Sequence, residues 1–171
     1  MDKNIILVGF MGCGKTTAGK ITAERLGYRF IDTDRLIEKN ESMSITDIFE
    51  KKGEPYFRQR ELETARALSG ERRSVIATGG GMARSGDIMS LLKQSGKAVY
   101  IKASAEKIFS NLKDDNTRPL LTGGDKYEKI KSLLAERESL YNSAADIIID
   151  TDGKTAKETA KSIIAALEGI I

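Results

Sequence analysis

A glycine-rich stretch near the start of this sequence reads Gly9-Phe10-Met11-Gly12-Cys13-Gly14-Lys15-Thr16. It matches the pattern G-x-x-x-x-G-K-[ST], in which glycines let the backbone turn until several amides point at one anion. The apolar run Asn4–Val8 before it predicts a buried strand, and Lys15–Leu26 after it predicts a helix. A phosphate group would therefore meet both the loop amides and a helix N-terminus.

The residue types in this loop predict ATP and Mg²⁺ as ligands. Gly12, Cys13 and Gly14 would supply backbone contacts, and Lys15 would reach the β- and γ-phosphates. The Thr16 hydroxyl would bind Mg²⁺, while Thr17 would cap the turn next to it. Cys13 has two interpretations: a small loop residue, which we favour, or a redox-sensitive thiol at a helix N-terminus.

Composition limits the chemistry. The chain has 171 residues, as expected for a single domain, and 28 basic against 25 acidic residues give a formal charge of +3. This excess is small for a nucleic-acid binder, so we expect small anionic ligands and no nucleic-acid partner. The sequence contains no histidine. A general base would therefore be a carboxylate, Lys, Tyr or Cys.

The same composition predicts a cytoplasmic protein. Cys13 is the single cysteine, so it cannot form an internal disulfide, and this favours a reducing compartment. The apolar run Ile5–Val8 is too short for a signal peptide, and no stretch approaches the 18 apolar residues of a membrane span. We expect a monomer without a membrane partner.

Strand and helix patterns alternate along the chain, which predicts an α/β fold with a parallel sheet covered on both faces. In such sheets ligands bind beyond the carboxyl ends of the strands. The predicted strands are Asn4–Val8, Tyr28–Asp32, Ser74–Thr78, Ala98–Lys102 and Asp146–Asp150. The predicted helices are Lys15–Leu26, 33–40, 45–52, Glu54–Ser69, Ser85–Ser95, 105–112, 126–142 and Thr155–Glu168.

Two polar motifs follow strands at the expected ligand edge. Asp32-Thr33-Asp34 could serve Mg²⁺ or an acceptor hydroxyl, or it could be a surface turn in which Asp34 caps the next helix. Gly79-Gly80-Gly81 could bring backbone amides close to a ligand, or it could be a plain turn.

Arginines supply the remaining candidates. Arg58 and Glu61 share one face of a helix, where they form either part of a site or an ordinary surface ion pair. Arg118 lies in the polar segment Lys113–Gly124, which we interpret as a mobile lid, although a solvated loop charge is an equal alternative. Arg137 lies on the helix after that segment, where a surface charge is the simpler interpretation.

These motifs together resemble the shikimate kinase family over essentially the whole chain. The glycine-rich loop, Asp32-Thr33-Asp34 and Gly79-Gly80-Gly81 carry the resemblance. So do Phe57-Arg58 with Glu61, Arg118-Pro119-Leu120-Leu121, and Glu136-Arg137 with Tyr141. The resemblance implies a three-layer α/β/α fold of the nucleoside-monophosphate-kinase type, with a five-stranded parallel sheet in the order 2-3-1-4-5. It implies one kinase domain over 1–171, a lid over about 112–124 and acceptor-binding helices over about 34–62.

The resemblance also implies an activity and residue roles. ATP would phosphorylate shikimate to shikimate 3-phosphate, with Asp34, Lys15 and Arg118 as catalytic residues. Arg118 would also contact ATP. Thr16 would bind Mg²⁺, and Asp32 would help order it through water. The acceptor would be bound by Asp34, Arg58, Glu61, Gly79, Gly80, Gly81 and Arg137.

Some expectations have weaker support. Lys154 and a residue near Asn111 are our only suggestions for the adenine contacts, and no motif supports them.

A kinase for gluconate or a nucleotide is one alternative function. An ATP-binding module without an acceptor is another, although a GTPase is disfavoured because the sequence lacks an Asn-Lys-x-Asp segment.

Overall fold

The central strand of the protein, β1 (Asn4–Val8), is buried along its whole length. It pairs in parallel with β3 (Ser74–Ala77) on one side and with β4 (Gly96–Lys102) on the other. β2 (Arg29–Asp32) and β5 (Ile147–Asp150) complete a five-stranded parallel sheet in the order β2-β3-β1-β4-β5. The structure is a computed structural model that describes residues 2–116 and 119–170. The predicted strand order is confirmed.

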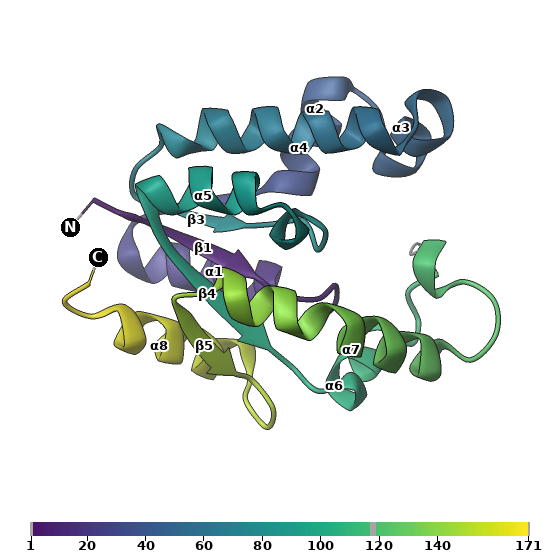
Figure 1. Cartoon of the computed structure of the whole chain (residues 1–171). Coiled ribbons are helices and arrows are strands. Elements are labelled where there is room, and N and C mark those ends of the chain that lie inside the picture. Colours follow the sequence, from purple (N-terminus) through teal and green to yellow (C-terminus); the bar gives the residue numbers. More distant parts are fainter. Residues whose placement is uncertain (1, 117–118, 171) are drawn as a thin grey trace.

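Helices cover both faces of this sheet, as Figure 1 shows. α1 packs beside α8 and against β3, while α5 and α7 pack against β4 from the opposite face. α2, α3 and α4 contact one another, α2 also contacts β2, and α4 packs on α5. Helices on both faces of the sheet confirm the three-layer architecture. The helices are α1 (Lys15–Leu26), α2 (Thr33–Glu41), α3 (Ile45–Lys52), α4 (Glu54–Ser69), α5 (Gly86–Ser95), α6 (Ala105–Leu112), α7 (Lys126–Ala144) and α8 (Ala156–Leu167), with short 3₁₀ helices η1 (Met82–Arg84) and η2 (Pro119–Leu121).

A buried asparagine connects the amino ends of the three central strands, at the end of the sheet opposite the phosphate loop. Asn4 Nδ2 donates to Glu71 O and to Ser95 Oγ, both at 2.9 Å, and Asn4 Oδ1 accepts from Ser74 N at 3.0 Å. The side chain is fully buried, and its hydrogen bonds replace those it would make with water. Asn4 therefore fixes the starts of β1, β3 and β4 relative to one another.

The core lies between the sheet and its two helix layers. Apolar side chains of β1, β3 and β4 form its centre, and Tyr100 and Tyr141 are its largest fully buried residues. A second, smaller cluster joins α2, α3 and α4 through Ile37, Ile48 and Phe57. The helices expected to bind the acceptor therefore have a small core of their own.

Several sequence-based element boundaries were wrong by one or two residues, with the largest differences at β4 and α7. β4 begins at Gly96 rather than Ala98, α7 continues to Ala144 rather than Asn142, and the two 3₁₀ helices were not anticipated. Gly96 pairs with Asn4, and an added Cβ at Gly96 would overlap the Asn4 backbone. Because glycine has no Cβ, β4 can begin at this residue, directly after α5. Within the described residues, none of the helices has the length and apolar character needed to cross a membrane.

Candidate active site

The phosphate loop lies between β1 and α1, as the sequence predicts. Gly9, Gly12 and Gly14 have φ angles of 149°, 75° and 98°, in the region that side chains rarely adopt. The Cys13 N–H donates to Phe10 O at 3.2 Å, which closes the turn. A Cβ at Gly12 would lie 2.6 Å from the side chain of Leu112, so close packing against α6 also requires glycine there.

Lys15 crosses this loop from the first turn of α1. Its side chain is buried, and Nζ donates to Gly9 O at 2.6 Å and to Phe10 O at 2.9 Å. Cys13 Sγ is buried and lies 3.6 Å from the same ammonium. The loop therefore concentrates positive charge where its amides and the helix N-terminus favour a phosphate.

Thr16 and Asp32 meet at the start of α2. Thr16 Oγ1 donates to Asp32 Oδ2 at 3.2 Å, and Asp32 Oδ1 accepts from Asp34 N and Arg35 N at 3.1 and 3.2 Å. Asp32 is therefore the residue that caps α2, and the interpretation of Asp34 as the helix cap is wrong.

Thr16 Oγ1 and Asp32 Oδ2 suit Mg²⁺. This ion keeps several waters and usually takes only one or two protein ligands beside substrate phosphates. The described residues contain no group of three or more His, Cys, Asp or Glu side chains able to enclose a metal. A hydroxyl and a carboxylate beside the phosphate loop fit an ion that phosphates and water mostly coordinate.

The glycine loop Gly79–Gly81 brings the expected acceptor residues together. A Cβ at Gly79 would overlap the Asp34 carboxylate, and a Cβ at Gly81 would lie 2.6 Å from Arg58 Nη1. A Cβ at Gly80 would lie 3.8 Å from Met11 N and 4.0 Å from Arg137 Nη1. These glycines lack positive φ angles, and a Cβ at Gly79 or Gly81 would force the end of the Asp34 or Arg58 side chain to move.

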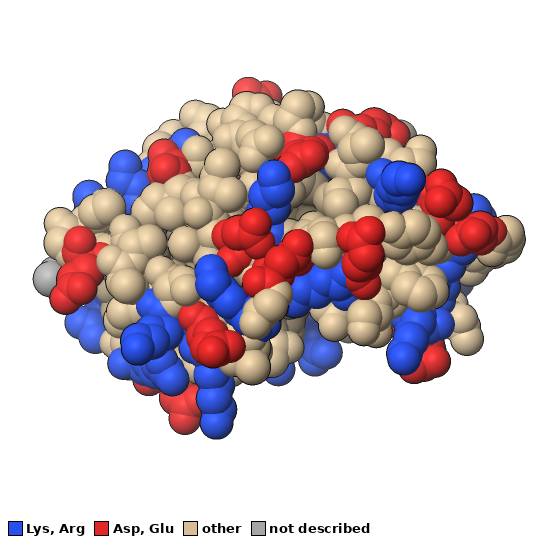
Figure 2. All heavy atoms as spheres, turned by 90° about the horizontal axis from the view of Figure 1, so that it is seen from below, with Lys and Arg blue, Asp and Glu red and all other residues tan. Residues whose placement is uncertain are grey.

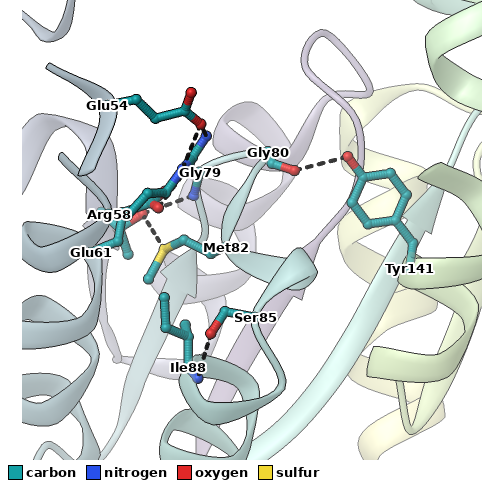
Figure 3. Close-up of polar contacts among 10 residues, drawn as sticks. Glu54, Arg58, Glu61, Gly79, Gly80, Met82, Ser85, Ile88 and Tyr141 are labelled. Atoms are coloured by element: carbon teal, nitrogen blue, oxygen red, sulfur yellow. Dashed lines mark hydrogen bonds and ion pairs between the residues drawn. The ribbon is translucent and has the colours of Figure 1, made fainter. Parts of the chain in front are cut away.

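Arg58 reaches this loop from α4 with two acidic partners. Its Nη1 donates to Glu61 Oε2 at 2.7 Å, and its Nη2 donates to Glu54 Oε1 at 3.0 Å (Figure 3). Burial raises the pKa of the Glu61 carboxyl, against the opposing effect of Arg58, and the nearby charge of Asp34 acts in the same direction as burial. Burial alone would lower the pKa of Arg58, but the contacts with Glu61 and Glu54 together outweigh it and raise that pKa. Arg58 is therefore fixed as a cation.

Arg137 approaches from α7, across the loop from Arg58. It is 7% exposed, its guanidinium lies 5.8 Å from the Phe10 ring centroid, and its Nε has no hydrogen-bond partner among the described residues. Buried polar groups are normally hydrogen-bonded, so an unpaired guanidinium N–H beside the glycine loop suits an anionic ligand.

The suggested adenine contacts border a hollow on the other side of the phosphate loop. This hollow, of about 610 Å³, is lined by residues of α6 and of the segment 152–154, including Asn111 and Lys154. Asn111 Nδ2 donates to Gly12 O at 2.8 Å, which connects α6 to the phosphate loop. Lys154 Nζ donates to Asp150 O at 2.6 Å. Both residues therefore line one hollow, which Asn111 connects to the phosphate loop.

Arg118 lies outside the described residues, as does Thr117. The structure describes the expected lid on both sides of these two residues. It follows the lid from the end of α6 at Leu112 through Asn116, and again from η2 to the start of α7. Lys126 Nζ donates to the carbonyls of Leu112 and Asp115 at 3.0 and 2.8 Å. The base of this segment is therefore fixed to the start of α7.

Sequence reasoning missed two residues that contact the glycine loop. Thr33 Oγ1 accepts from Gly79 N at 2.8 Å, and Tyr141 donates to Gly80 O at 3.0 Å. Thr33 lies inside a motif chosen for its two aspartates, and Tyr141 was noted without a role. No local pattern reveals either contact, because each joins segments distant in the sequence.

Charged side chains of both signs cover one face of the molecule. On the face seen in Figure 2, Lys and Arg side chains are interspersed with Asp and Glu.

Comparison with known proteins identifies the family. The family model for shikimate kinase matches residues 11–168. The shikimate kinase of Alkaliphilus oremlandii is 47% identical over 166 residues, which cover 96% of this chain and 98% of that protein. The shikimate kinase of Thermodesulfovibrio yellowstonii is 45% identical over 166 residues, covering 97% and 95%.

A solved structure agrees with these sequence matches. The shikimate kinase from Acinetobacter baumannii in complex with shikimate aligns with a TM-score of 0.91 at 38% identity, covering 99% of this chain and 95% of that chain. The matches extend over the phosphate loop, the glycine loop and α7 alike. The chain therefore belongs to the shikimate kinase family.

Proposed function

We propose that this protein transfers the γ-phosphoryl group of ATP to the 3-hydroxyl of shikimate, giving shikimate 3-phosphate and ADP. The observation that carries the proposal is the glycine loop, around which Asp34, Arg58 and Arg137 converge beside the phosphate loop. Family membership and the shikimate named with the Acinetobacter baumannii structure favour this acceptor over gluconate or a nucleotide.

Recognition of the acceptor would rely on two arginines from different elements. Guanidinium groups bind planar carboxylates through paired hydrogen bonds, and Arg58 and Arg137 reach the glycine loop from α4 and α7. Glu61 would hold Arg58 in place, because their contact is short and the Glu61 side chain is buried. Gly80 would add a backbone contact to the same ligand.

Catalysis would rely on orientation and on positive charge. Asp34 lies against Gly79, where its carboxylate would orient the attacking hydroxyl and accept its proton late in the reaction. An ordinary aspartate is a weak base at neutral pH, so most of the rate would come from stabilising the transferred group. Lys15 and Arg118 would supply positive charge. Mg²⁺, held by Thr16 and ordered by Asp32, would neutralise phosphate charge when bound.

An acceptor panel tests this proposal. ADP release is followed in a coupled assay with shikimate, gluconate and nucleoside monophosphates as separate acceptors. We expect ADP release to depend on shikimate alone. Absence of turnover with shikimate would overturn the proposal, and turnover with another acceptor would identify a related kinase instead.

The alternative of an ATP-binding module without an acceptor needs a binding measurement. Titration of shikimate by calorimetry, with and without ADP, is expected to give one site per chain. An absence of heat in both titrations, together with retained ADP binding, would favour the silent module. A monomeric state and a cytoplasmic location stay predictions from the composition.

A further inference from the structure

We infer that Tyr141 and Thr33 are positioning residues, which fix the conformation of the glycine loop Gly79–Gly81 against which the acceptor would bind. This inference rests on the proposed function, because it concerns the same site. Neither side chain is assigned to bind the acceptor itself.

Tyr141 holds the loop from the α7 side. Its side chain is 1% exposed, and its ring packs on Tyr100 with centroids 5.3 Å apart. The hydroxyl donates to Gly80 O at 3.0 Å (Figure 3). Burial raises the pKa of this hydroxyl, against the opposing effects of the Arg137 charge and of a hydrogen bond with Arg137.

This contact fixes the direction of a backbone donor. The C=O and N–H of a trans peptide point in opposite directions, and the structure has no cis peptide among its described residues. Because Gly80 O points at Tyr141, the Gly81 N–H points away from it. Figure 3 shows Arg58 and Tyr141 approaching the loop from opposite sides. The Gly81 N–H is therefore directed away from α7.

Thr33 holds the other end of the loop. It is fully buried, and its Oγ1 accepts from Gly79 N at 2.8 Å and donates to Met82 Sδ at 3.2 Å. The Gly79 carbonyl accepts from Met82 N at 3.1 Å. Thr33 therefore ties the start of the glycine loop to the segment that carries Asp32 and Asp34.

These contacts leave two donors unused. Gly81 O accepts from Arg84 N at 3.1 Å, so every carbonyl of the glycine loop has a partner. Within residues 2–116 and 119–170, no atom accepts a hydrogen bond from the N–H of Gly80 or Gly81. Preorganised backbone donors of this kind bind oxygen without reorganising, and here they adjoin Arg58 and Arg137.

Conservative variants test the inference through separate Michaelis constants. Tyr141→Phe and Thr33→Val each remove one hydroxyl with little change in shape. For each variant we expect the KM for shikimate to rise about fivefold to tenfold, the effect of one lost hydrogen bond. The KM for ATP is expected to stay within about twofold, because neither residue contacts the phosphate loop.

Two further variants separate positioning from general stability. Thr33→Ser keeps the hydroxyl and is expected to recover most of the loss seen in Thr33→Val. Tyr28→Phe is the matched control. It removes a tyrosine hydroxyl just before β2, at the amino ends of the strands, whereas the glycine loop lies at their carboxyl ends. Should Thr33→Val fail to fold, Tyr141→Phe still provides the comparison.

The possible outcomes distinguish this inference from the proposed function. Wild-type shikimate turnover with an unchanged shikimate KM in Tyr141→Phe and Thr33→Val would overturn only the positioning roles. Parallel rises in both KM values would also overturn them, because they would indicate general loosening. Wild-type turnover with a different acceptor would overturn the proposed function. The positioning roles would then be supported by a raised KM for that acceptor in both variants and overturned by an unchanged one. No turnover with any acceptor would overturn both the function and the inference.

Discussion

Gly80 differs from its two neighbours in the space around it. A Cβ at Gly79 or Gly81 would collide with Asp34 or Arg58, whereas the nearest atom to a Cβ at Gly80 is 3.8 Å away. An alanine at Gly80 is therefore accommodated by the protein alone, and its methyl group would occupy space between Met11 and Arg137. The protein's own atoms therefore do not require glycine at this position, and we propose that the acceptor does.

Gly80→Ala should therefore reduce acceptor binding without reducing stability. We expect the KM for shikimate to rise by an order of magnitude or more, since even small core overlaps cost about 1–3 kcal/mol. The KM for ATP and the thermal midpoint should stay near those of the wild type. Steady-state kinetics and thermal unfolding measure both effects. A variant that loses stability but keeps its shikimate KM would show that the glycine is structural.

Asp34→Asn tests the role of the carboxylate. The amide keeps the size of the side chain but cannot accept the hydroxyl proton, so kcat should fall by roughly 10²–10⁴-fold. Binding of ATP should change little, because Asp34 lies against Gly79 rather than in the phosphate loop. Single-turnover kinetics and nucleotide titration give the two quantities. Turnover near the wild-type rate would exclude Asp34 as the proton acceptor.

At the scale of single elements, β5 depends on a charged contact at its start. Asp146 precedes the strand and accepts from Ala98 N at 2.8 Å, while Lys93 Nζ lies 2.9 Å from its other oxygen. Burial would raise the pKa of Asp146, but the contacts with Lys93 and Ala98 outweigh it and lower that pKa below its ordinary value. The ionised carboxylate therefore stabilises the pairing of β5 with β4.

The lowered pKa of Asp146 predicts a pH-dependent contribution to stability. Its folded-state pKa lies below the unfolded value, so the stabilisation is complete above about pH 4 and is lost as pH falls through the folded-state pKa. Asp146→Asn should lower the free energy of unfolding by about 1 kcal/mol near neutral pH. Urea unfolding at several pH values should show this difference shrinking toward about pH 3. Exposed Asp114→Asn is the control, and a difference independent of pH would contradict this account.

Element boundaries show where local sequence patterns fail. The start of β4 was placed at the first apolar residue, Ala98, but the strand begins at Gly96. Gly96 pairs with Asn4, and this pairing depends on a neighbour distant in the sequence. The alternative in which Asp34 caps α2 is wrong, because Asp32 makes the capping contacts. Aspartate suits a cap at either position, so the sequence does not distinguish the two residues.

At the scale of the whole molecule, local patterns predicted a parallel α/β sheet but not its strand order. That order came from the family resemblance, because strand neighbours depend on long-range packing. The motifs at the carboxyl ends of β1, β2 and β3 do lie together, as the geometry of parallel sheets requires. The contacts of Thr33 and Tyr141 could not be predicted, because they arise only when α2 and α7 approach the glycine loop.

The central claim is that one site joins the phosphate loop to a shikimate-binding glycine loop. Phosphorus NMR of a reaction containing ATP, Mg²⁺ and shikimate tests it most directly. The account predicts one phosphate ester on the 3-hydroxyl of shikimate for each ADP formed. Formation of ADP with inorganic phosphate, or an ester on another hydroxyl, would contradict it.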